Sequence, residues 1–303
     1  GAAGGLGYGF SYASGTLSVT PKALTISATT NNKVYDASAA ATSSLSSDKL
    51  QNDVLVLSNT SSVFSDKNAG VGKTVTVSGL SISGTDASNY NLTNVVASST
   101  ATITPKALTA SYTAANRVYD STTTATVSGT STDIISGDTV TFTPTTATFN
   151  NKNVGTNKAV SITGVQLGGT DGSNYALTSN TGSATANITA KSLTAAFTTT
   201  TKEYDGTTAA TVVGNSTQIA GTDVVTIAST SASFSDKNAG TGKTVSVAGI
   251  SIAGTDAGNY SLANTTATTT GNITTKALSI SGITAANKTY DGTTSATVST
   301  ASA

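Results

Sequence analysis

The 303-residue sequence contains no histidine, cysteine, methionine or tryptophan, and its only glutamate is Glu203. A Ser-His-Asp triad would therefore lack its base, and a Cys-His pair cannot form. Zinc and iron sites would lose their usual nitrogen and sulfur ligands, and disulfides are impossible. These absences predict that the chain is not an enzyme and carries no catalytic, cofactor-binding or metal-ligating residues. A chain without cysteine also suits export in the unfolded state, because no thiols can mispair.

Charge is scarce and balanced, with 15 basic and 15 acidic residues that together make up 10% of the chain. The charges are scattered singly, so no basic stripe is available to neutralise phosphates, and nucleic acid is excluded as a predicted partner. No apolar run approaches the roughly 20 residues that span a bilayer, so no membrane insertion is expected from this segment. The beginning, from Gly1 to Gly5, has no signal-peptide pattern, which predicts a segment of a longer chain.

A period of about 85 residues organises the sequence. Tyr-Asp recurs four times, while Phe-x-x-Lys-Asn and Gly-Thr-Asp-x-x-Asn-Tyr-x-Leu each recur three times in a constant order. The predicted domains are a tail of a preceding repeat at 1–20, three complete repeats at 21–104, 105–189 and 190–274, and the head of a further repeat at 275–303.

Within one repeat, apolar residues alternate with polar ones, as in Val75, Val77, Leu80 and Ile82. This period of two predicts half-buried strands, and Gly-rich or Asp-rich turns separate them. Only the Ala- and Ser-rich stretch 36–50 suggests a helical turn. The pattern predicts an all-β chain of tandem small β-sandwich domains of immunoglobulin-like type, with a β-grasp-like sheet as the alternative.

The repeated aromatic residues are the predicted core anchors, because an 85-residue domain has a modest core to which one or two rings contribute much. The aspartate beside each repeated tyrosine is expected to accept hydrogen bonds from turn amides. The structural motif residues are Tyr35, Asp36, Tyr119, Asp120, Tyr204, Asp205, Tyr290, Asp291, Phe64, Phe149, Phe234, Tyr90, Tyr175 and Tyr260.

The segments Lys202 to Thr211 and Lys288 to Thr297 follow the pattern Lys-x-Tyr-Asp-Gly-Thr-Thr-x-Ala-Thr. They resemble the YDG repeat family and its MBG relatives, which occur in long bacterial exoproteins such as filamentous-haemagglutinin-like, two-partner-secretion adhesins. Ala37 and Ser121 replace the motif glycine in two copies. The resemblance implies an extracellular or bacterial cell-surface, outer-membrane-associated location and an adhesive role, and it implies no catalytic residues.

Two functional hypotheses follow. In the first, the repeats form a structural stalk that projects a distal binding region for attachment or biofilm formation, with neighbouring repeats of the same chain as partners. In the second, the repeats are themselves a multivalent module for host or matrix glycan or protein. The second requires exposed rings, whereas the first predicts buried ones.

Two chemical alternatives accompany these hypotheses. Asp36, Asp86 and Asn89 could supply oxygen ligands for calcium, but no Asp-x-Asp-x-Asp-Gly loop is present, so no cofactor is predicted. A Lys-Asn crosslink is conceivable through Lys67 or Lys237, although Asp-Lys-Asn-Ala-Gly is also typical of an exposed turn.

Overall fold

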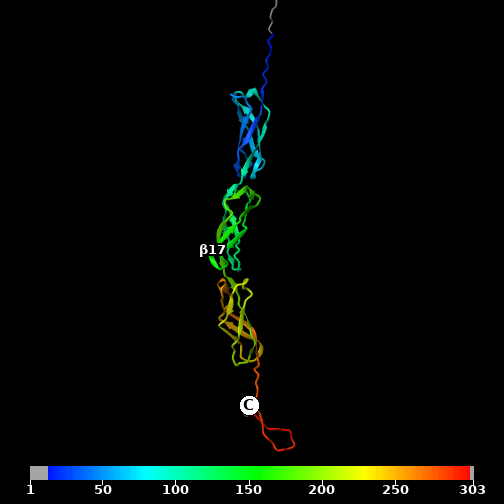
Figure 1. The fold of residues 1–303 in the computed structure, drawn as a ribbon, viewed down its shortest axis with the longest axis vertical. Coiled ribbons are helices and arrows are strands. Elements are labelled where there is room, and N and C mark those ends of the chain that lie inside the picture. Colours follow the sequence, from blue (N-terminus) through cyan, green and yellow to red (C-terminus); the bar gives the residue numbers. More distant parts are fainter. Residues whose placement is uncertain (1–12, 301–303) are drawn as a thin grey trace, which may run out of the picture. The chain divides into compact units, whose positions relative to one another are not determined.

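The computed structural model describes residues 13–300, and within that range the regular structure consists of β-strands and three short 3-10 turns (Figure 1). The first twelve residues of the predicted tail at 1–20, and residues 301–303 of the predicted final head, lie outside the described residues. The chain forms two compact units, each described below by itself. The described residues of unit 1 are 13–113, Val127–Ala147 and Ser161–Ala184, and those of unit 2 are Ala114–Thr126, Thr148–Val160 and 185–300.

Repeat 1 lies entirely in unit 1 and contains ten strands and one 3-10 turn. Its elements are β1 (Lys22–Leu24), β2 (Ile26–Thr30), β3 (Lys33–Val34), β4 (Ser43–Ser47), β5 (Val56–Ser58), β6 (Ser61–Phe64), β7 (Gly70–Ser78), β8 (Ser81–Ser83), η1 (Ala87–Asn89), β9 (Tyr90–Leu92) and β10 (Val96–Thr104).

The main sheet of repeat 1 has the strand order β3-β10-β7-β6. β3 is parallel to β10, and the other two pairings in this sheet are antiparallel. The pairs β2-β4 and β5-β8 are antiparallel, and β1 is parallel to β9. The main sheet and these smaller pairs enclose the core of the repeat.

The core follows from the alternation in the sequence. In β7, Val75 and Val77 are completely buried, while the residues between and beside them face outward. Phe64, Ile26 and Ile103 join them from β6, β2 and β10. Each strand thus presents one apolar face to the core, as a half-buried antiparallel strand requires.

Repeat 3 lies in unit 2 and repeats the arrangement, with a main sheet of order β23-β30-β27-β26. Val245 and Val247 take the places of the two β7 valines in its core. Its elements are β21 (Lys191–Leu193), β22 (Ala196–Thr199), β23 (Lys202–Glu203), β24 (Val212–Asn215), β25 (Thr226–Ala228), β26 (Ser231–Phe234), β27 (Gly240–Ala248), β28 (Ser251–Ala253), η3 (Ala257–Asn259), β29 (Tyr260–Leu262) and β30 (Thr266–Thr274).

Repeat 2 has the same succession of elements, and its residues are divided between the two units. They are β11 (Lys106–Leu108), β12 (Ser111–Ala114), β13 (Arg117–Val118), β14 (Val127–Thr130), β15 (Thr141–Thr143), β16 (Thr146–Phe149), β17 (Gly155–Thr163), β18 (Gln166–Gly168), η2 (Gly172–Asn174), β19 (Tyr175–Leu177) and β20 (Gly182–Thr189). Beyond repeat 3, β31 (Thr284–Ala285) and β32 (Val298–Ser299) pair antiparallel. The predicted all-β class with tandem β-sandwich repeats is confirmed.

The helical turn expected within 36–50 is wrong. That stretch contains β4, whose five residues pair with β2 and alternate in burial. The 3-10 turns lie elsewhere, after each Gly-Thr-Asp, where the amide of Asn89 donates to the carbonyl of Asp86 at 3.0 Å in the first repeat. These Ala and Ser residues therefore adopt the strand conformation that pairing with β2 requires, because tertiary contacts override weak local helix propensity.

Candidate functional site at the repeat junctions

The repeated aromatic residues of repeats 1 and 2 are buried, and so are Phe234 and Tyr260 of repeat 3. Tyr204 is half-buried, whereas Tyr290 is 92% exposed on the segment that follows repeat 3. The fully buried motif rings, each at most 7% exposed, are Tyr35, Tyr119, Phe64, Phe149, Phe234, Tyr90, Tyr175 and Tyr260. These rings therefore form no exposed stacking platform.

The aspartate of each Tyr-Asp pair lies in a turn and contacts a cation from its own repeat. The Oδ1 atom of Asp36 accepts a hydrogen bond from the amide of Ser38 at 2.9 Å and one from Lys33 Nζ at 2.7 Å. Asp120 and Asp205 accept the same kind of turn bond. These carboxylates are about half exposed and belong to the local turn.

In unit 1, the two repeats are connected by a single residue. β10 ends at Thr104, and β11 begins at Lys106 directly after Pro105. The amide of Tyr35 donates to the carbonyl of Thr104 at 2.9 Å, and Lys106 pairs in register with Tyr175 in β19. The same short stretch of backbone therefore positions one tyrosine from each repeat.

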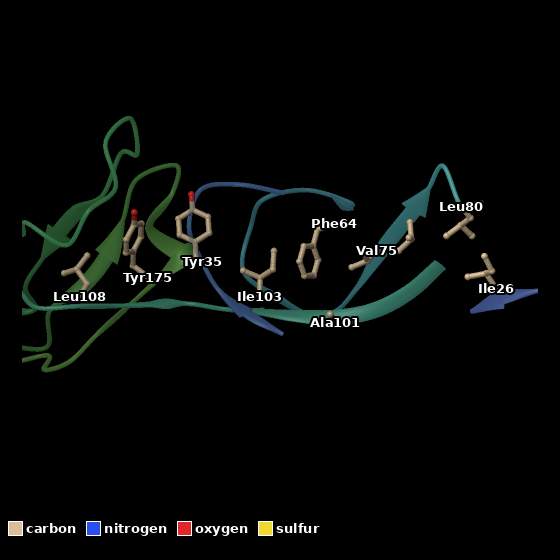
Figure 2. Close-up of a cluster of buried hydrophobic side chains, with 10 residues drawn as sticks. Ile26, Tyr35, Phe64, Val75, Leu80, Ala101, Ile103, Leu108 and Tyr175 are labelled. Atoms are coloured by element: carbon tan, nitrogen blue, oxygen red, sulfur yellow. The ribbon is translucent and has the colours of Figure 1, made fainter. Parts of the chain in front are cut away.

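The two tyrosines meet at the boundary between the repeats. Their ring centroids are 5.5 Å apart at an interplanar angle of 73°, which is the favoured edge-to-face geometry. Figure 2 shows Tyr35 and Tyr175 between Ile103 of repeat 1 and Leu108 of repeat 2. Tyr35 thus belongs to a hydrophobic cluster shared by two repeats, and repeat 1 is not the self-contained domain that the sequence suggests.

A buried carboxylate from repeat 2 joins both hydroxyl groups. Asp138 Oδ2 accepts hydrogen bonds from Tyr35 at 2.9 Å and from Tyr175 at 2.7 Å. Lys67 Nζ of repeat 1 lies 3.2 Å from Asp138 Oδ1 and 3.3 Å from Asp171 Oδ1. The Asp138 side chain is only 3% exposed, and its carboxylate is stabilised by donors from both repeats.

An asparagine forms a second bridge across the same boundary. Asn174 Oδ1 accepts a hydrogen bond from the amide of Ala69 at 2.8 Å, and Asn174 Nδ2 donates to Asn68 Oδ1 at 3.2 Å. Asn174 is 1% exposed, so its side-chain amide is buried together with the Asp138 carboxylate. The bond to a backbone amide fixes the loop of repeat 1 against repeat 2.

The two sides of this junction have different chemistry. We define the donor face as the side that contributes a tyrosine, a lysine, an asparagine and the backbone amide of the next residue. The acceptor face is the opposite side, which contributes two aspartates, an asparagine and a tyrosine. The donor face of repeat 1 consists of Tyr35, Lys67, Asn68 and Ala69, and the acceptor face of repeat 2 consists of Asp138, Asp171, Asn174 and Tyr175.

Unit 2 contains a second junction of the same construction. Asp223 Oδ2 accepts from Tyr119 at 2.7 Å and from Tyr260 at 2.8 Å, and the two rings are 5.6 Å apart at 74°. Lys152 Nζ lies 2.6 Å from Asp223 Oδ1 and 3.0 Å from Asp256 Oδ1. The asparagine bridge is also reproduced, since Asn259 Oδ1 accepts from the amide of Val154 at 2.9 Å and Asn259 Nδ2 donates to Asn153 Oδ1 at 3.3 Å. The same contacts occur at both junctions, so the junction recurs with the period of the repeat.

The junction also determines the protonation of its groups. Burial raises the pKa of the Asp138 carboxyl, but hydrogen bonds from Tyr175, Tyr35 and Lys67 lower it by more, so the pKa lies below its ordinary value. Burial, and then the hydrogen bond to Asp138, raise the pKa of Tyr175 to about 12. Interactions with Tyr35 and Asp138 raise the pKa of Lys67. The lysine stays charged, which opposes the amide-forming attack that a covalent crosslink would need.

Stability is expected to be constant between about pH 5 and pH 9, because the chain has no histidine. A carboxyl whose folded-state pKa is lowered stabilises the fold above its unfolded pKa of about 4, and this contribution is lost as the pH falls through the folded pKa. A tyrosine whose folded pKa is raised stabilises below about pH 10, and its contribution is lost as the pH approaches 12.

Thermal unfolding followed by circular dichroism from pH 2 to pH 11 measures this profile. We expect a plateau with a fall on each side, and a weaker acid fall when Asp138 and Asp223 are both replaced by asparagine. A slope within the plateau would contradict the assignment.

The sequence alone did not identify the acceptor carboxylates. The sequence pattern does not single out Asp138, and it predicts that Lys67 lies in an exposed turn. A signal was available, because aspartates recur at positions 53, 138 and 223 with the same spacing as the tyrosines. What the sequence lacked was any indication that residues 103 positions apart, such as Tyr35 and Asp138, lie in contact.

Within the described residues, no group of three or more acidic side chains could hold a metal ion. The calcium candidates have other partners: Asp36 binds Lys33, and Asp86 Oδ2 accepts from the amide of Val54 at 2.8 Å. Over the same described residues, no helix is long and apolar enough to cross a membrane.

Comparison with protein families identifies the repeats. The YDG domain matches residues 20–101, 104–182 and 189–269, which is more than half of the chain. The chain belongs to the YDG domain family. Each junction described above therefore connects two consecutive YDG domains. The tyrosine and the aspartate of the motif have different roles, because the tyrosine contacts the next domain and the aspartate stabilises the turn of its own domain.

Other comparisons add little to this assignment of YDG domains. No curated protein matches the chain. Among solved structures, Drosophila N-cadherin EC1-3 is 5% identical, with 75% of this chain and 91% of that chain covered and a TM-score of 0.21. The I9-I11 tandem from titin is 11% identical, with 85% and 98% covered and a TM-score of 0.19.

Proposed function

We propose that this chain is a structural spacer, a stalk segment of a secreted or cell-surface bacterial adhesin that holds a distal binding region away from the surface for attachment or biofilm formation. The observation that carries the proposal is the repeated junction, in which a buried carboxylate joins two tyrosines and a lysine from both sides. A connection of one residue, Pro105, leaves little freedom between the domains that it joins. The chemistry of the site serves connection and not turnover, so the proposal includes no enzymatic activity.

Burial of the rings supports the spacer over the multivalent glycan-binding module. A sugar platform requires an aromatic face open to solvent, and the motif rings of the first two repeats are at most 7% exposed. The neutral surface, rich in Thr and Ser, supports a segment that avoids strong attraction to other molecules. A glycan array probed with this chain would favour the module if it returned reproducible hits.

Small-angle X-ray scattering tests the spacer function directly. We expect the double variant Asp138→Ala, Asp223→Ala to have a smaller maximum dimension and a broader distribution of interatomic distances than the unmodified chain, because both junctions lose the acceptor that joins them. The matched control is Asp53→Ala, which removes the equivalent carboxylate of repeat 1, where no donor face is in contact within the described residues. An unchanged scattering profile of the double variant would contradict the proposal.

A further inference from the structure

A second set of contacts recurs in the three repeats and joins the first strands of each repeat to its last ones. The first strand is parallel to the strand that follows the 3-10 turn, and in repeat 1 this pair is β1 with β9. Lys22 lies opposite Tyr90, and Leu24 lies opposite Leu92. The last strand, β10 in repeat 1, is parallel to β3. Parallel pairs therefore connect the backbone that enters a repeat to the backbone that leaves it.

The parallel direction determines how tension along the chain would act on the β1-β9 pair. Tension from the preceding residues reaches β1 at Lys22, and it leaves β9 through Leu92 toward β10. Because the strands are parallel, Lys22 and Leu92 lie at opposite ends of the ladder. The strands must then slide past each other, so the evenly spaced hydrogen bonds between them are loaded together.

The β3-β10 pair is loaded in the same way. Tension pulls β10 from its last residue, Thr104, and it pulls β3 from its first residue, Lys33. Lys33 pairs with Ile103 and the next residue pairs with Thr104, so the two loaded ends are again at opposite ends of the ladder. The amide of Thr102 extends the contact, since it donates to Asn32 Oδ1 at 2.7 Å. Both parallel pairs of the repeat therefore resist tension in shear.

An asparagine lengthens the first ladder beyond the ends of its strands. Asn94 follows β9, and its Oδ1 accepts from the amide of Ile26 at 2.9 Å while its Nδ2 donates to the carbonyl of the same residue at 2.9 Å. The side-chain amide thus takes the place of a strand backbone opposite the start of β2. Asn264 makes the same two bonds to Ala195 in repeat 3, at 2.8 and 3.1 Å. These bonds add resistance to the same sliding motion.

Repeat 2 has a shorter ladder at this position. Ser179 stands where the other repeats have Asn94 and Asn264, and its hydroxyl bonds to Thr181 instead. The preceding bond is kept, from the amide of Thr178 to the carbonyl of Leu108 at 3.0 Å. The chain therefore contains both forms of the ladder, and a serine at the asparagine position is compatible with the fold.

From this loading geometry we propose that each repeat bears tension along the chain, with its two parallel pairs as a shear clamp. This function goes beyond spacing, because a spacer needs only length, whereas a clamp keeps the domain folded while the chain is pulled. Its use rests on the proposed stalk function, since tension arises when a segment lies between a surface and a bound distal region. Resistance to force depends on the rate of unfolding and not on equilibrium stability, so a domain with a modest core can have it.

Pulling single molecules of the full chain in two directions tests the clamp. The sequence has no cysteine, so introduced cysteines attach the handles specifically. Thr20→Cys with Val95→Cys loads β1 and β9 from opposite ends, in shear, whereas Thr20→Cys with Ser88→Cys loads them from the same end, so that their bonds break one after another. All three positions are exposed. We expect the force that separates the strands to be at least about twofold higher in shear, because the bonds share the load.

Asn94→Ser, which introduces the residue of repeat 2, tests the asparagine. It should lower the force in shear by about a third, because it removes two of the bonds that share the load. The force from the same end should change little, because these bonds lie at the far end of the ladder. The matched control is Asn59→Ser, which replaces a half-buried asparagine that donates to Ser62 outside the clamp, and it should leave both forces unchanged.

Equal forces in the two directions would overturn the proposal, and so would a control that lowers the force in shear as much as Asn94→Ser does. Circular dichroism verifies that each variant is folded before it is pulled. The spacer function is tested separately, because scattering reports the dimensions of the chain without load and depends on Asp138 and Asp223, which lie outside the clamp. A chain that keeps its dimensions but has equal forces in both directions would be a spacer without a clamp.

Discussion

Asp138→Ala is expected to lower the free energy of unfolding of the coupled repeats by about 2–4 kcal/mol. The substitution leaves the hydroxyls of Tyr35 and Tyr175 without their acceptor in a buried place, and it removes the carboxylate that Lys67 contacts. Removing one partner of a buried charged network costs more than the interaction itself contributes, because the remaining groups are desolvated without compensation.

Asp53→Ala is the matched control for this substitution. Asp53 accepts a hydrogen bond from Tyr90 of its own repeat but contacts no donor face in the described residues, so its replacement should cost only about 1 kcal/mol. Urea unfolding at micromolar concentration, followed by circular dichroism, gives both values. Equal losses for the two variants would mean that Asp138 acts only within its own repeat.

A local measurement separates coupling from general destabilisation. The amide of Ala69 donates to Asn174 across the junction, and its hydrogen exchange should accelerate in Asp138→Ala. The amide of Tyr35 donates to Thr104 within repeat 1 and should change much less.

Tyr35→Ala is expected to have a larger effect, about 3–5 kcal/mol, because it removes a ring that is 2% exposed and opens a cavity in the cluster shared by two repeats. The ring of Tyr175 loses its edge-to-face partner at the same time. Urea unfolding should then show repeat 1 unfolding separately from the rest of the chain, since nearest-neighbour coupling is what joins the transitions of repeat proteins.

Two further tyrosine variants test this assignment. Tyr35→Phe keeps the ring and loses only the bond to Asp138, so a loss of about 1–2 kcal/mol is expected. Tyr204→Ala replaces the equivalent ring of repeat 3, which is half-buried and has no partner ring in the described residues, and it should cost less than Tyr35→Ala. A loss as large as that of Tyr35→Ala would contradict a role for Tyr35 at the junction.

Much of the fold follows from the sequence because its determinants are local and repeated. Alternation at Val75 and Val77 indicates which face of a strand is buried, and the constant spacing of the motifs defines the repeat. The buried rings of Phe64, Phe149 and Phe234 follow from the same pattern. The 3-10 turn after Asp86 was missed, because Asp-x-x-Asn-Tyr has no apolar periodicity from which a single helical turn could be recognised.

The junction could be predicted only in part. Tyr35 was recognised as a core residue, but a tyrosine in a period-two pattern gives no indication of whether its core belongs to one repeat or to two. Asp138 follows Gly137, whose φ of 95° is typical of a turn, and a turn aspartate is ordinarily solvated. Its burial results from the approach of a second repeat, which is a long-range event that local sequence does not encode.

The unlike chemistry of the donor and acceptor faces gives every repeat a direction, since a donor face matches an acceptor face and not another donor. Recombination that removes one whole period, such as 105–189, brings Tyr35 and Lys67 against Asp223 and Asp256. Duplication of the same period brings Tyr119 and Lys152 against the second copy of Asp138 and Asp171. In both cases the residue types in contact are the same as they are now. Copy number can therefore change in a single genetic step without a new interface having to evolve. A deletion that is not a whole period would place unlike residues at the boundary and leave a buried carboxylate without its cation.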